Sequence, residues 1–310
     1  MGEPIAVSIV SGFLGAGKTT FLLDALRGDD TVVVLNEISD AMTELELFGD
    51  RPPRLLTGGC VCCDRAEELR ALLRELAGRS RETPLAHVVI ETTGLAHPER
   101  VAELLRDDPL LRHRTALREI VVVVDVLTVR RTLAAHREAV DQIAAADRVV
   151  LSKTDLCEPP EVAGAVALVR AVNPSAELVA PGPLPELPPA GPPLDVATEP
   201  GEHLSSVRTL TLRPGAPLSW PVFGVWLTML LHAHGARVLR FKARVDAGGT
   251  GPVLLDAVQD VVHPPRHLAG WGSETPGSEL TFVTRDLEVE QLERSLALFQ
   301  DRLAVLVPDP

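Results

Sequence analysis

The apolar residues of this chain fall into short β-branched runs separated by stretches with helical periodicity. Residues 4–10 predict a buried strand, a helix follows from about Thr19 to Arg27, and Thr31–Leu35 predicts a second strand. An amphipathic helix is expected over Asp64–Leu76, where Asp64 and Glu67 have the spacing of a capping box. Three further runs typical of buried strands are His87–Ile90, Ile120–Val124 and Arg148–Ser152. Continuous apolar strands that alternate with helices predict an α/β domain with a mainly parallel sheet covered by helices.

This alternation stops at Pro181. Between residues 181 and 200 eight positions are proline and no periodicity remains, which predicts a stiff linker at residues 181–203. Beyond it, strands are expected at Val207–Leu212, Val238–Val245, Pro252–Val262 and Leu280–Thr284, with helices at Trp220–His232 and Leu287–Arg302. The sequence therefore predicts a first domain over residues 1–180 and a small α+β domain over residues 204–310.

Composition and charge narrow the class of protein. With 310 residues, 45% hydrophobic and 24% charged, the chain can fold around a large core. Its net charge of −13 argues against nucleic acid or an anionic membrane as the main partner, because both need a basic surface. No apolar run approaches the ~20 residues of a membrane span. Residues 1–15 lack the features of a signal peptide, so we expect a cytoplasmic protein.

A phosphate-binding loop is predicted between the first strand and the first helix. Residues 12–19 read GFLGAGKT and fit the pattern G-x-x-x-x-G-K-[ST] in its expected context. We expect Lys18 to reach the β- and γ-phosphates of a nucleotide and the Thr19 hydroxyl to bind Mg²⁺. The residues expected to contact the nucleotide here are Gly12, Gly15, Ala16, Gly17, Lys18, Thr19 and Thr20.

Acidic residues at the ends of later strands are candidates for the second Mg²⁺ contact. Glu91 ends the third predicted strand, next to the phosphate-binding loop in a fold of this class, so we group it with Lys18 and Thr19 as catalytic. Asp125 ends the following strand and is a weaker candidate of the same kind, because a turn after a strand often carries Asp as a cap.

The segment Ser152-Lys153-Thr154-Asp155 resembles the [NT]-K-x-D motif of GTPases. The Asp155 carboxylate can accept two hydrogen bonds from guanine N1 and N2, which adenine cannot supply, and the Lys153 stem packs over the base. Ser152 stands where Asn is usual, so we expect one anchoring contact to be weaker or missing. Asn173 and Pro174 are candidates for the loop that covers the base.

Three thiols stand close together at Cys60, Cys62 and Cys63. Cytosolic thiols stay reduced, and such a cluster can bind Zn²⁺, Co²⁺ or Cu⁺. The helix that follows lowers thiol pKa values and so favours the thiolate that metals bind. Glu37 and Asp40 are candidates for the remaining ligand. A redox switch and ordinary buried cysteines are the competing interpretations.

The other cysteine and several histidines are weaker candidates. We expect Cys157 to be structural. His232 and His234 diverge on a helix because they are two residues apart. His263 and His267 flank two prolines and are more typical of surface residues than of ligands, and Lys242 is expected to be solvated.

The order of these motifs resembles one protein family. GFLGAGKTT, Asn36-Glu37, GGCVCC, ETTGLAHP and SKTDL follow one another as in CobW-type GTPases, relatives of the HypB and UreG accessory proteins. Residues 238–242 and 254–259, and then Trp271-Gly272, look like that family's C-terminal domain. After Asn36-Glu37 the family commonly has Phe-Gly-Glu, whereas this chain reads Ile-Ser-Asp, which shortens the acidic side chain at Asp40.

The resemblance implies a slow GTPase that uses GTP and Mg²⁺. It also implies a transition metal, zinc most often and cobalt sometimes, delivered to a client protein. A nucleotide-dependent homodimer is compatible with this interpretation. Two alternatives stay open: a small-molecule kinase that uses the same phosphate-binding loop, and a non-enzymatic metal sensor whose nucleotide is structural. Asp155 and the cysteine cluster favour the GTPase.

Overall fold

A computed structural model describes residues 3–25, 30–37, 48, 53–57, 60–61, 65–79, 85–181, 207–272 and 275–303. Within these ranges, the side chains of residues 24, 25, 37, 57, 79 and 236 are outside the description. The chain divides into two units, Met1–Leu204 and Ser205–Pro310. Apart from Pro181, the predicted linker lies outside the described residues.

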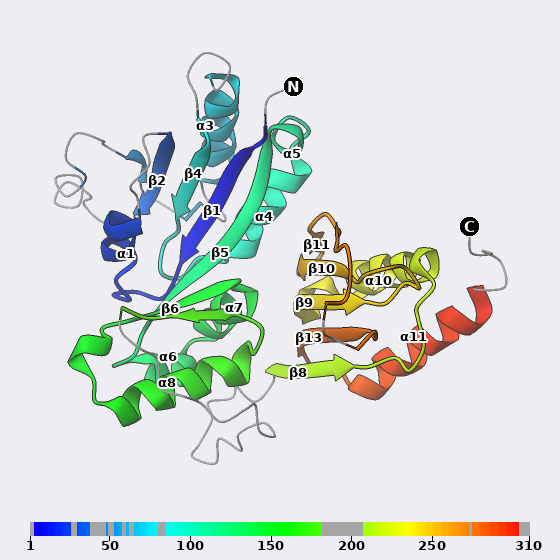
Figure 1. Cartoon of the computed structure of the whole chain (residues 1–310). Coiled ribbons are helices and arrows are strands. Elements are labelled where there is room, and N and C mark those ends of the chain that lie inside the picture. The colour runs from blue at the N-terminus through cyan, green and yellow to red at the C-terminus, as the bar shows by residue number, and fades with distance from the viewer. Residues whose placement is uncertain are drawn as a thin grey trace. The chain divides into compact units, whose positions relative to one another are not determined.

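A seven-stranded sheet forms the centre of the first unit (Figure 1), in the order β3-β2-β4-β1-β5-β6-β7. Every neighbouring pair is parallel. The strands are β1 (Ile5–Ser11), β2 (Thr31–Glu37), β3 (Arg54–Thr57), β4 (His87–Glu91), β5 (Thr115–Asp125), β6 (Arg148–Ser152) and β7 (Glu177–Val179). The predicted parallel sheet is confirmed. The edge strands β3 and β7 were not predicted, because segments of four and three residues carry too little apolar pattern.

Among the described residues, helices connect β1 to β2 and each consecutive pair of strands from β3 onward, as parallel strands require. They are α1 (Lys18–Ala25), α3 (Ala66–Arg79), α4 (Pro98–Asp107), α5 (Leu111–Arg114), α6 (Val129–Ala135), α7 (Arg137–Ala145) and α8 (Pro159–Val172), with a 3-10 turn, η2 (Thr154–Leu156). Helix α4 packs on β1 and β5, and α7 packs on β5 and α8. Helix α3 begins two residues later than predicted, and Asp64 of the expected capping box lies outside the described residues.

Asn173 corrects one expectation about the site. It follows α8, is fully buried, and its Nδ2 donates to the carbonyl oxygens of Ile143, Ala144 and Ala146 at 2.9–3.1 Å. The last carbonyls of a helix lack partners within that helix, and Asn173 supplies them for α7. The Asn173 side chain therefore links the end of α8 to the end of α7 by hydrogen bonds. The hypothesis that Asn173 covers the base is wrong.

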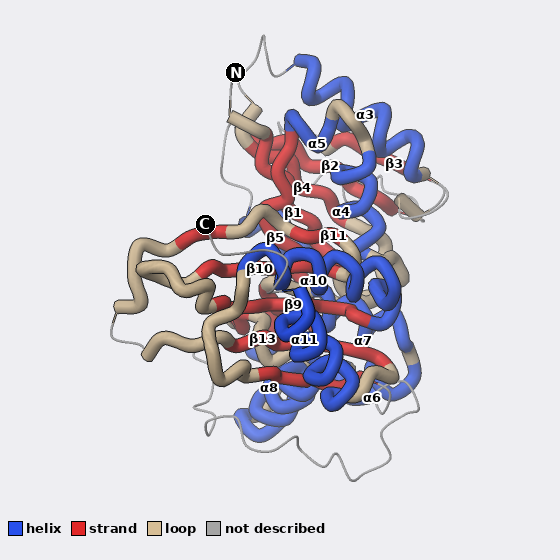
Figure 2. The backbone as a smooth tube through the Cα atoms, turned by 90° about the vertical axis from the view of Figure 1, so that its right-hand side faces the viewer, coloured by secondary structure: helices blue, strands red, loops and turns tan. Residues whose placement is uncertain are grey.

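The second unit contains an antiparallel sheet in the order β11-β10-β9-β13-β8, with β12 paired to β10. Its elements are β8 (Val207–Leu212), α10 (Trp220–His234), η3 (Gly235–Arg237), β9 (Val238–Val245), β10 (Val253–Val258), β11 (Val261–Val262), β12 (Arg266–His267), β13 (Glu279–Arg285) and α11 (Val289–Leu303). Figure 2 shows α10 and α11 beside each other against this sheet. Phe223, Trp226, Phe241 and Phe282 form the centre of the core between them.

The predicted α+β character of the second unit is confirmed, with one correction. The single strand expected over Pro252–Val262 is a hairpin of β10 and β11, in which Ala257 pairs with Val262. The chain reverses at Gln259, whose φ of 51° is left-handed. Among the described residues, no helix is both long enough and apolar enough to cross a membrane.

Candidate nucleotide and metal site

The motifs predicted to bind nucleotide and metal gather at one edge of the parallel sheet. Gly12 follows β1, Glu91 ends β4, Asp125 ends β5 and Ser152 ends β6, and these strands are neighbours in the order β4-β1-β5-β6. Ligands of open parallel sheets bind outside the carboxyl ends of the strands. The topology therefore brings together residues separated by up to 140 positions in the sequence.

The phosphate-binding loop has the backbone that its glycines were expected to provide. Gly12 has φ 140°, and a Cβ there would lie 2.3 Å from the Val123 carbonyl oxygen, so no other residue fits. Gly15 and Gly17 also have positive φ, at 73° and 89°. Helix α1 begins directly afterwards, so its first N–H groups and its dipole face this loop. Lys18 Nζ lies 3.1 Å from the Gly12 carbonyl oxygen.

Thr19 and Glu91 meet, as a shared Mg²⁺ site requires. The Thr19 hydroxyl donates to Glu91 Oε1 across 3.4 Å, and Glu91 is only 5% exposed. One hydroxyl and one carboxylate at a helix N-terminus are the hard oxygen donors that Mg²⁺ prefers. This contact is compatible with the prediction that Glu91 supplies the second Mg²⁺ contact.

Asp125 has a different set of partners. Its Oδ2 forms an ion pair with Lys153 Nζ at 2.8 Å, and its Oδ1 accepts from the Leu127 N–H at 2.9 Å. Asp125 thus caps the turn after β5 and holds Lys153, whose backbone is left-handed with φ 59°. The weaker interpretation of Asp125 as an Mg²⁺ contact gains no support from these bonds.

The side chain of Ser152 contacts the phosphate-binding loop. Its Oγ donates to the Ala16 carbonyl oxygen at 2.7 Å, so the segment that carries the guanine motif is tied to the phosphate-binding loop. Ser152 therefore makes an anchoring contact, and the expectation that this contact is weaker than that of Asn stays a prediction.

Beyond Ser152, the guanine motif continues into the turn η2. Asp155 is exposed there, where its carboxylate is accessible to a ligand. Cys157 ends this turn, and its thiol donates to the Lys153 carbonyl oxygen at 3.2 Å. Burial raises the pKa of the Cys157 thiol, and nearby carboxylates, that of Glu161 first, raise it further. A protonated thiol with a backbone partner has a structural role, as expected for Cys157.

The first cysteine of the cluster is held against β2 by a buried amide. Asn36 is 2% exposed; its Nδ2 donates to the Leu56 carbonyl oxygen at 3.0 Å, and its Oδ1 accepts from the Val61 N–H at 2.9 Å. The Cys60 carbonyl oxygen accepts from the Arg65 N–H at 3.1 Å, directly before α3. Asn36 therefore fixes both ends of the segment that carries Cys60.

The remaining predicted metal ligands are not described. Cys62, Cys63 and Asp40 lie outside the described residues, and only the backbone of Glu37 is described, at the end of β2. Among the side chains that the structure does describe, no group of three His, Cys, Asp or Glu residues could hold a metal ion. The complete ligand set therefore stays a prediction.

Two residues of the site carried no signal that the sequence analysis used. Thr93 is 5% exposed, and its hydroxyl donates to Cys60 Sγ at 3.4 Å. Gln142 of α7 is buried, and its Nε2 donates to the carbonyl oxygens of Gly94 and Ala96 at 3.1 and 2.9 Å. Both contacts fix the loop that follows Glu91, and both join residues more than 30 positions apart.

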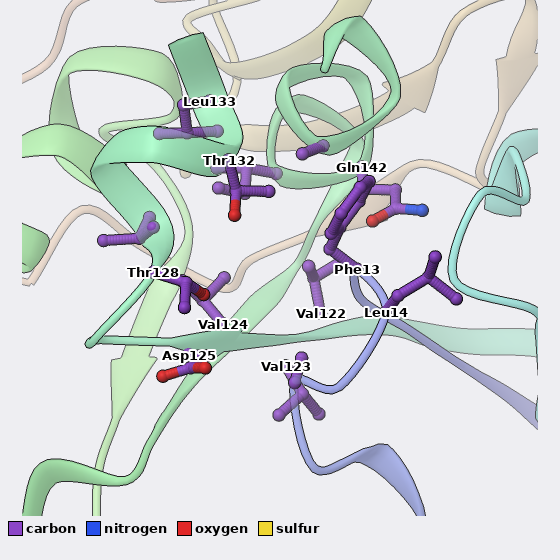
Figure 3. A pocket seen from close by; sticks show the side chains of 14 residues that line it. Phe13, Leu14, Val122, Val123, Val124, Asp125, Thr128, Thr132, Leu133 and Gln142 are labelled. Atoms are coloured by element: carbon purple, nitrogen blue, oxygen red, sulfur yellow. The ribbon is translucent and has the colours of Figure 1, made fainter. Parts of the chain in front are cut away.

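A small cavity lies behind the phosphate-binding loop (Figure 3). Its walls are mainly apolar, with Phe13 and Leu14 from the loop facing β5, α6 and α7. Phe13 also stacks on His136, with ring centroids 4.5 Å apart. Phe13 therefore contributes to packing, whereas Leu14 lines the cavity and is 61% exposed.

Four candidate histidines and Lys242 belong to the second unit. His232 and His267 are exposed, and His234 and His263 are partly buried. His267 contacts the edge of Trp220, with ring centroids 6.1 Å apart. Lys242 lies within β9, paired in register with Asp256 and Thr281 on the neighbouring strands.

Comparison with known families decides which group of proteins this site belongs to. The CobW/HypB/UreG nucleotide-binding domain matches residues 6–180, more than half of the chain. The chain belongs to the CobW/HypB/UreG family. The cobalamin synthesis protein CobW C-terminal domain matches residues 207–300, so both units of this family member have counterparts.

Named relatives include three metal-related proteins. The chain is 34% identical to the zinc chaperone YjiA of Escherichia coli over 166 residues, which cover 51% of this chain and 52% of YjiA. It is 33% identical to the zinc chaperone CobW of Pseudomonas aeruginosa, covering 54% of this chain and 52% of that protein. It is 33% identical to zinc-regulated GTPase metalloprotein activator 1 of Schizosaccharomyces pombe, covering 50% and 40%. The matches thus span about half the length of these relatives or less.

The fold is also shared with a solved structure. Zn(II)-bound YjiA GTPase from E. coli superposes with a TM-score of 0.70 at 20% identity, covering 96% of this chain and 99% of YjiA. At that identity the likeness establishes the fold alone. It confirms the predicted P-loop NTPase domain with an α+β C-terminal domain.

Proposed function

We propose that this protein is a GTP-hydrolysing metallochaperone that binds a transition metal, zinc first, and delivers it to a client protein. One observation carries the proposal: the phosphate-binding loop, Glu91 and the segment of Cys60 adjoin at one edge of the sheet, linked by the bonds of Thr19 and Thr93. The names of three relatives as zinc chaperones or a zinc-regulated GTPase support it.

Each residue of the nucleotide site has a role in this proposal. Thr19 and Glu91 would hold Mg²⁺, which supplies charge stabilisation to the phosphates when bound. Lys18 turns from the Gly12 carbonyl oxygen to the β- and γ-phosphates. Asp155 accepts from guanine N1 and N2, and its exposure leaves it accessible to the base. Ser152 keeps this recognition segment in register with the phosphate-binding loop through Ala16.

The metal is the cargo of the protein. We propose that it binds through Cys60, Cys62 and Cys63, with Glu37 or Asp40 as the remaining ligand. Three thiolates favour Zn²⁺, with Co²⁺ as the alternative, over Mg²⁺ or Ca²⁺. The bond from the N–H of Arg65, the residue before α3, to the Cys60 carbonyl oxygen supports this, because it ties the cysteine segment to the start of a helix, where thiolates are stabilised.

Hydrolysis and metal binding are tested separately. Purified protein should release phosphate from GTP over many turnovers with Mg²⁺, and Lys18→Ala should abolish that release while leaving the circular dichroism spectrum unchanged. A kinase would instead prefer ATP and require an acceptor, and a sensor would bind GTP without turnover.

Zinc titration with a chelating indicator should give tight binding that the Cys62→Ser, Cys63→Ser double variant loses. Unchanged zinc affinity in that variant would remove the proposed site.

A nucleotide-dependent homodimer is proposed as the assembly, in the cytoplasm. Four leucines, each between 46% and 64% exposed, lie on the loops after β1, β4, β5 and β6: Leu14, Leu95, Leu127 and Leu156. Exposed apolar side chains gathered on one edge are typical of an interaction surface. Light scattering with a non-hydrolysable GTP analogue should give twice the mass found with GDP. A single mass in both states would contradict the dimer and leave the client as the partner of this edge.

A further inference from the structure

Cys60 is bonded to the loop that also carries the candidate magnesium carboxylate. Thr93 lies two residues after Glu91, and its hydroxyl donates to Cys60 Sγ across 3.4 Å. Glu91 in turn accepts from Thr19, the residue after the phosphate-binding lysine. Two hydrogen bonds and a three-residue stretch of backbone thus join the start of α1 to a predicted metal ligand.

The loop on the nucleotide side of this contact is held at several points. The Thr92 N–H donates to the Val10 carbonyl oxygen at 2.9 Å, and Gln142 fixes the carbonyls of Gly94 and Ala96. Gly94 also lies against Leu14 of the phosphate-binding loop: a Cβ on Gly94 would stand 2.7 Å from the Leu14 backbone nitrogen. A shift of Leu14 on nucleotide binding would therefore press directly on the backbone of this loop at Gly94.

The cysteine side of the contact is fixed independently. Asn36 holds Leu56 and Val61 to β2, and the Arg65 N–H holds the Cys60 carbonyl oxygen. The cysteine segment therefore has anchors that do not involve the loop after Glu91. The Thr93 to Cys60 hydrogen bond is consequently the contact that joins the two sides.

We propose that Thr93 is the positioning residue through which the state of the nucleotide changes the affinity of Cys60 for metal. A sulfur that accepts an O–H bond donates less charge to a metal, and hydrogen bonds to ligand atoms tune metal affinity strongly. When the Thr93 to Cys60 hydrogen bond forms or breaks with the GTP or GDP state, the affinity for zinc therefore changes as well. The inference rests on the proposed function, because it assumes that Cys60 is a metal ligand and that the nucleotide moves the loop.

The test compares zinc affinity in two nucleotide states for the parent and three variants. Zinc alone is titrated against a chelating indicator, with Mg²⁺ and either a non-hydrolysable GTP analogue or GDP. Thr93→Val keeps the shape of the side chain and removes the hydroxyl, so the ratio of the two zinc dissociation constants should move towards one by about 2- to 13-fold, the effect of one neutral hydrogen bond. Thr93→Ser restores the hydroxyl and should restore the ratio.

Thr92→Val is the matched control. It removes the neighbouring hydroxyl, which donates to Ser11 Oγ at 3.0 Å and not to Cys60, and should leave the ratio as in the parent. Cobalt substitution gives a second readout, since the thiolate-to-cobalt absorption band should shift in Thr93→Val and not in Thr93→Ser. Affinity for the GTP analogue, measured without zinc and unchanged in all three variants, shows that the domain is folded.

The possible outcomes distinguish the delivery mechanism from the role of Thr93. If the parent binds zinc equally in both states, the delivery mechanism and the role of Thr93 both fail. If the parent shows the difference and Thr93→Val keeps it, the role of Thr93 alone is wrong. An equal loss in Thr92→Val also overturns that role, because the effect then belongs to the loop as a whole.

Discussion

Replacing Asn36 by leucine removes both hydrogen bonds that hold the Cys60 segment to β2. Leucine has a similar volume, so the change leaves the Leu56 carbonyl and the Val61 N–H without partners and opens little cavity. Val61 is 1% exposed, so water does not replace the lost bond to its N–H. Each buried orphan group costs about 1–3 kcal/mol, and we expect the free energy of unfolding to fall by about 2–5 kcal/mol. In urea the midpoint should fall by about 1–2 M.

The same variant should bind zinc at least roughly tenfold more weakly, because Cys60 is no longer held in place. Asn173→Leu is the matched control: it replaces the other buried asparagine, which bonds three carbonyls near the end of α7 and not the cysteine segment. It should lower the urea midpoint and leave zinc affinity unchanged. An unaltered midpoint in Asn36→Leu, or equal losses of zinc affinity in the two variants, would refute the reasoning.

Three further predictions concern the nucleotide and pH. Asp155→Asn should weaken GTP by about 10- to 100-fold and favour xanthosine triphosphate, because one charge-assisted bond is lost; equal GTP affinity in a competition assay would contradict guanine recognition. Ser152→Ala should weaken GTP by about 2- to 13-fold through loss of its bond to Ala16. The hydrogen bond to Glu99 raises the pKa of His97, so His97 stabilises the fold fully below about pH 6.5, and this stability is lost as the pH rises through the raised value. Urea midpoints should therefore fall above pH 6.5 in the parent more than in His97→Gln.

Sequence patterns predicted the parallel sheet and the edge at which its motifs gather. The reason is physical: continuous apolar strands need helices on both faces, and motif residues directly after strands must share one edge. Gly12, Lys18, Thr19 and Glu91 all follow from this argument. The elements of the second unit were predicted equally well, except at two places. A left-handed residue at Gln259 turns one expected strand into a hairpin, and the two-residue strand β12 was not predicted.

Contacts between distant segments could not be predicted in the same way. Thr93 and Cys60 are 33 positions apart, and Gln142 reaches back 46 and 48 positions to the loop that it fixes. No local pattern marks such pairs, because each depends on how neighbouring loops pack. Asn173 before a proline was interpreted as part of the loop that covers the base for the same reason. Asn173 is buried because it bonds carbonyl groups near the end of α7, which have no partner within that helix. This contact is visible only in three dimensions.

The zinc affinity of the parent protein in its two nucleotide states tests the central claim most directly. A competition titration with a zinc indicator, with Mg²⁺ and either a non-hydrolysable GTP analogue or GDP, gives both dissociation constants. We expect tighter zinc binding with the GTP analogue by about 5- to 150-fold, the usual range of coupling between two sites. Linkage then requires zinc to tighten binding of the GTP analogue, relative to that of GDP, by the same factor. Equal zinc affinities in the two states would contradict a chaperone that releases its metal on hydrolysis.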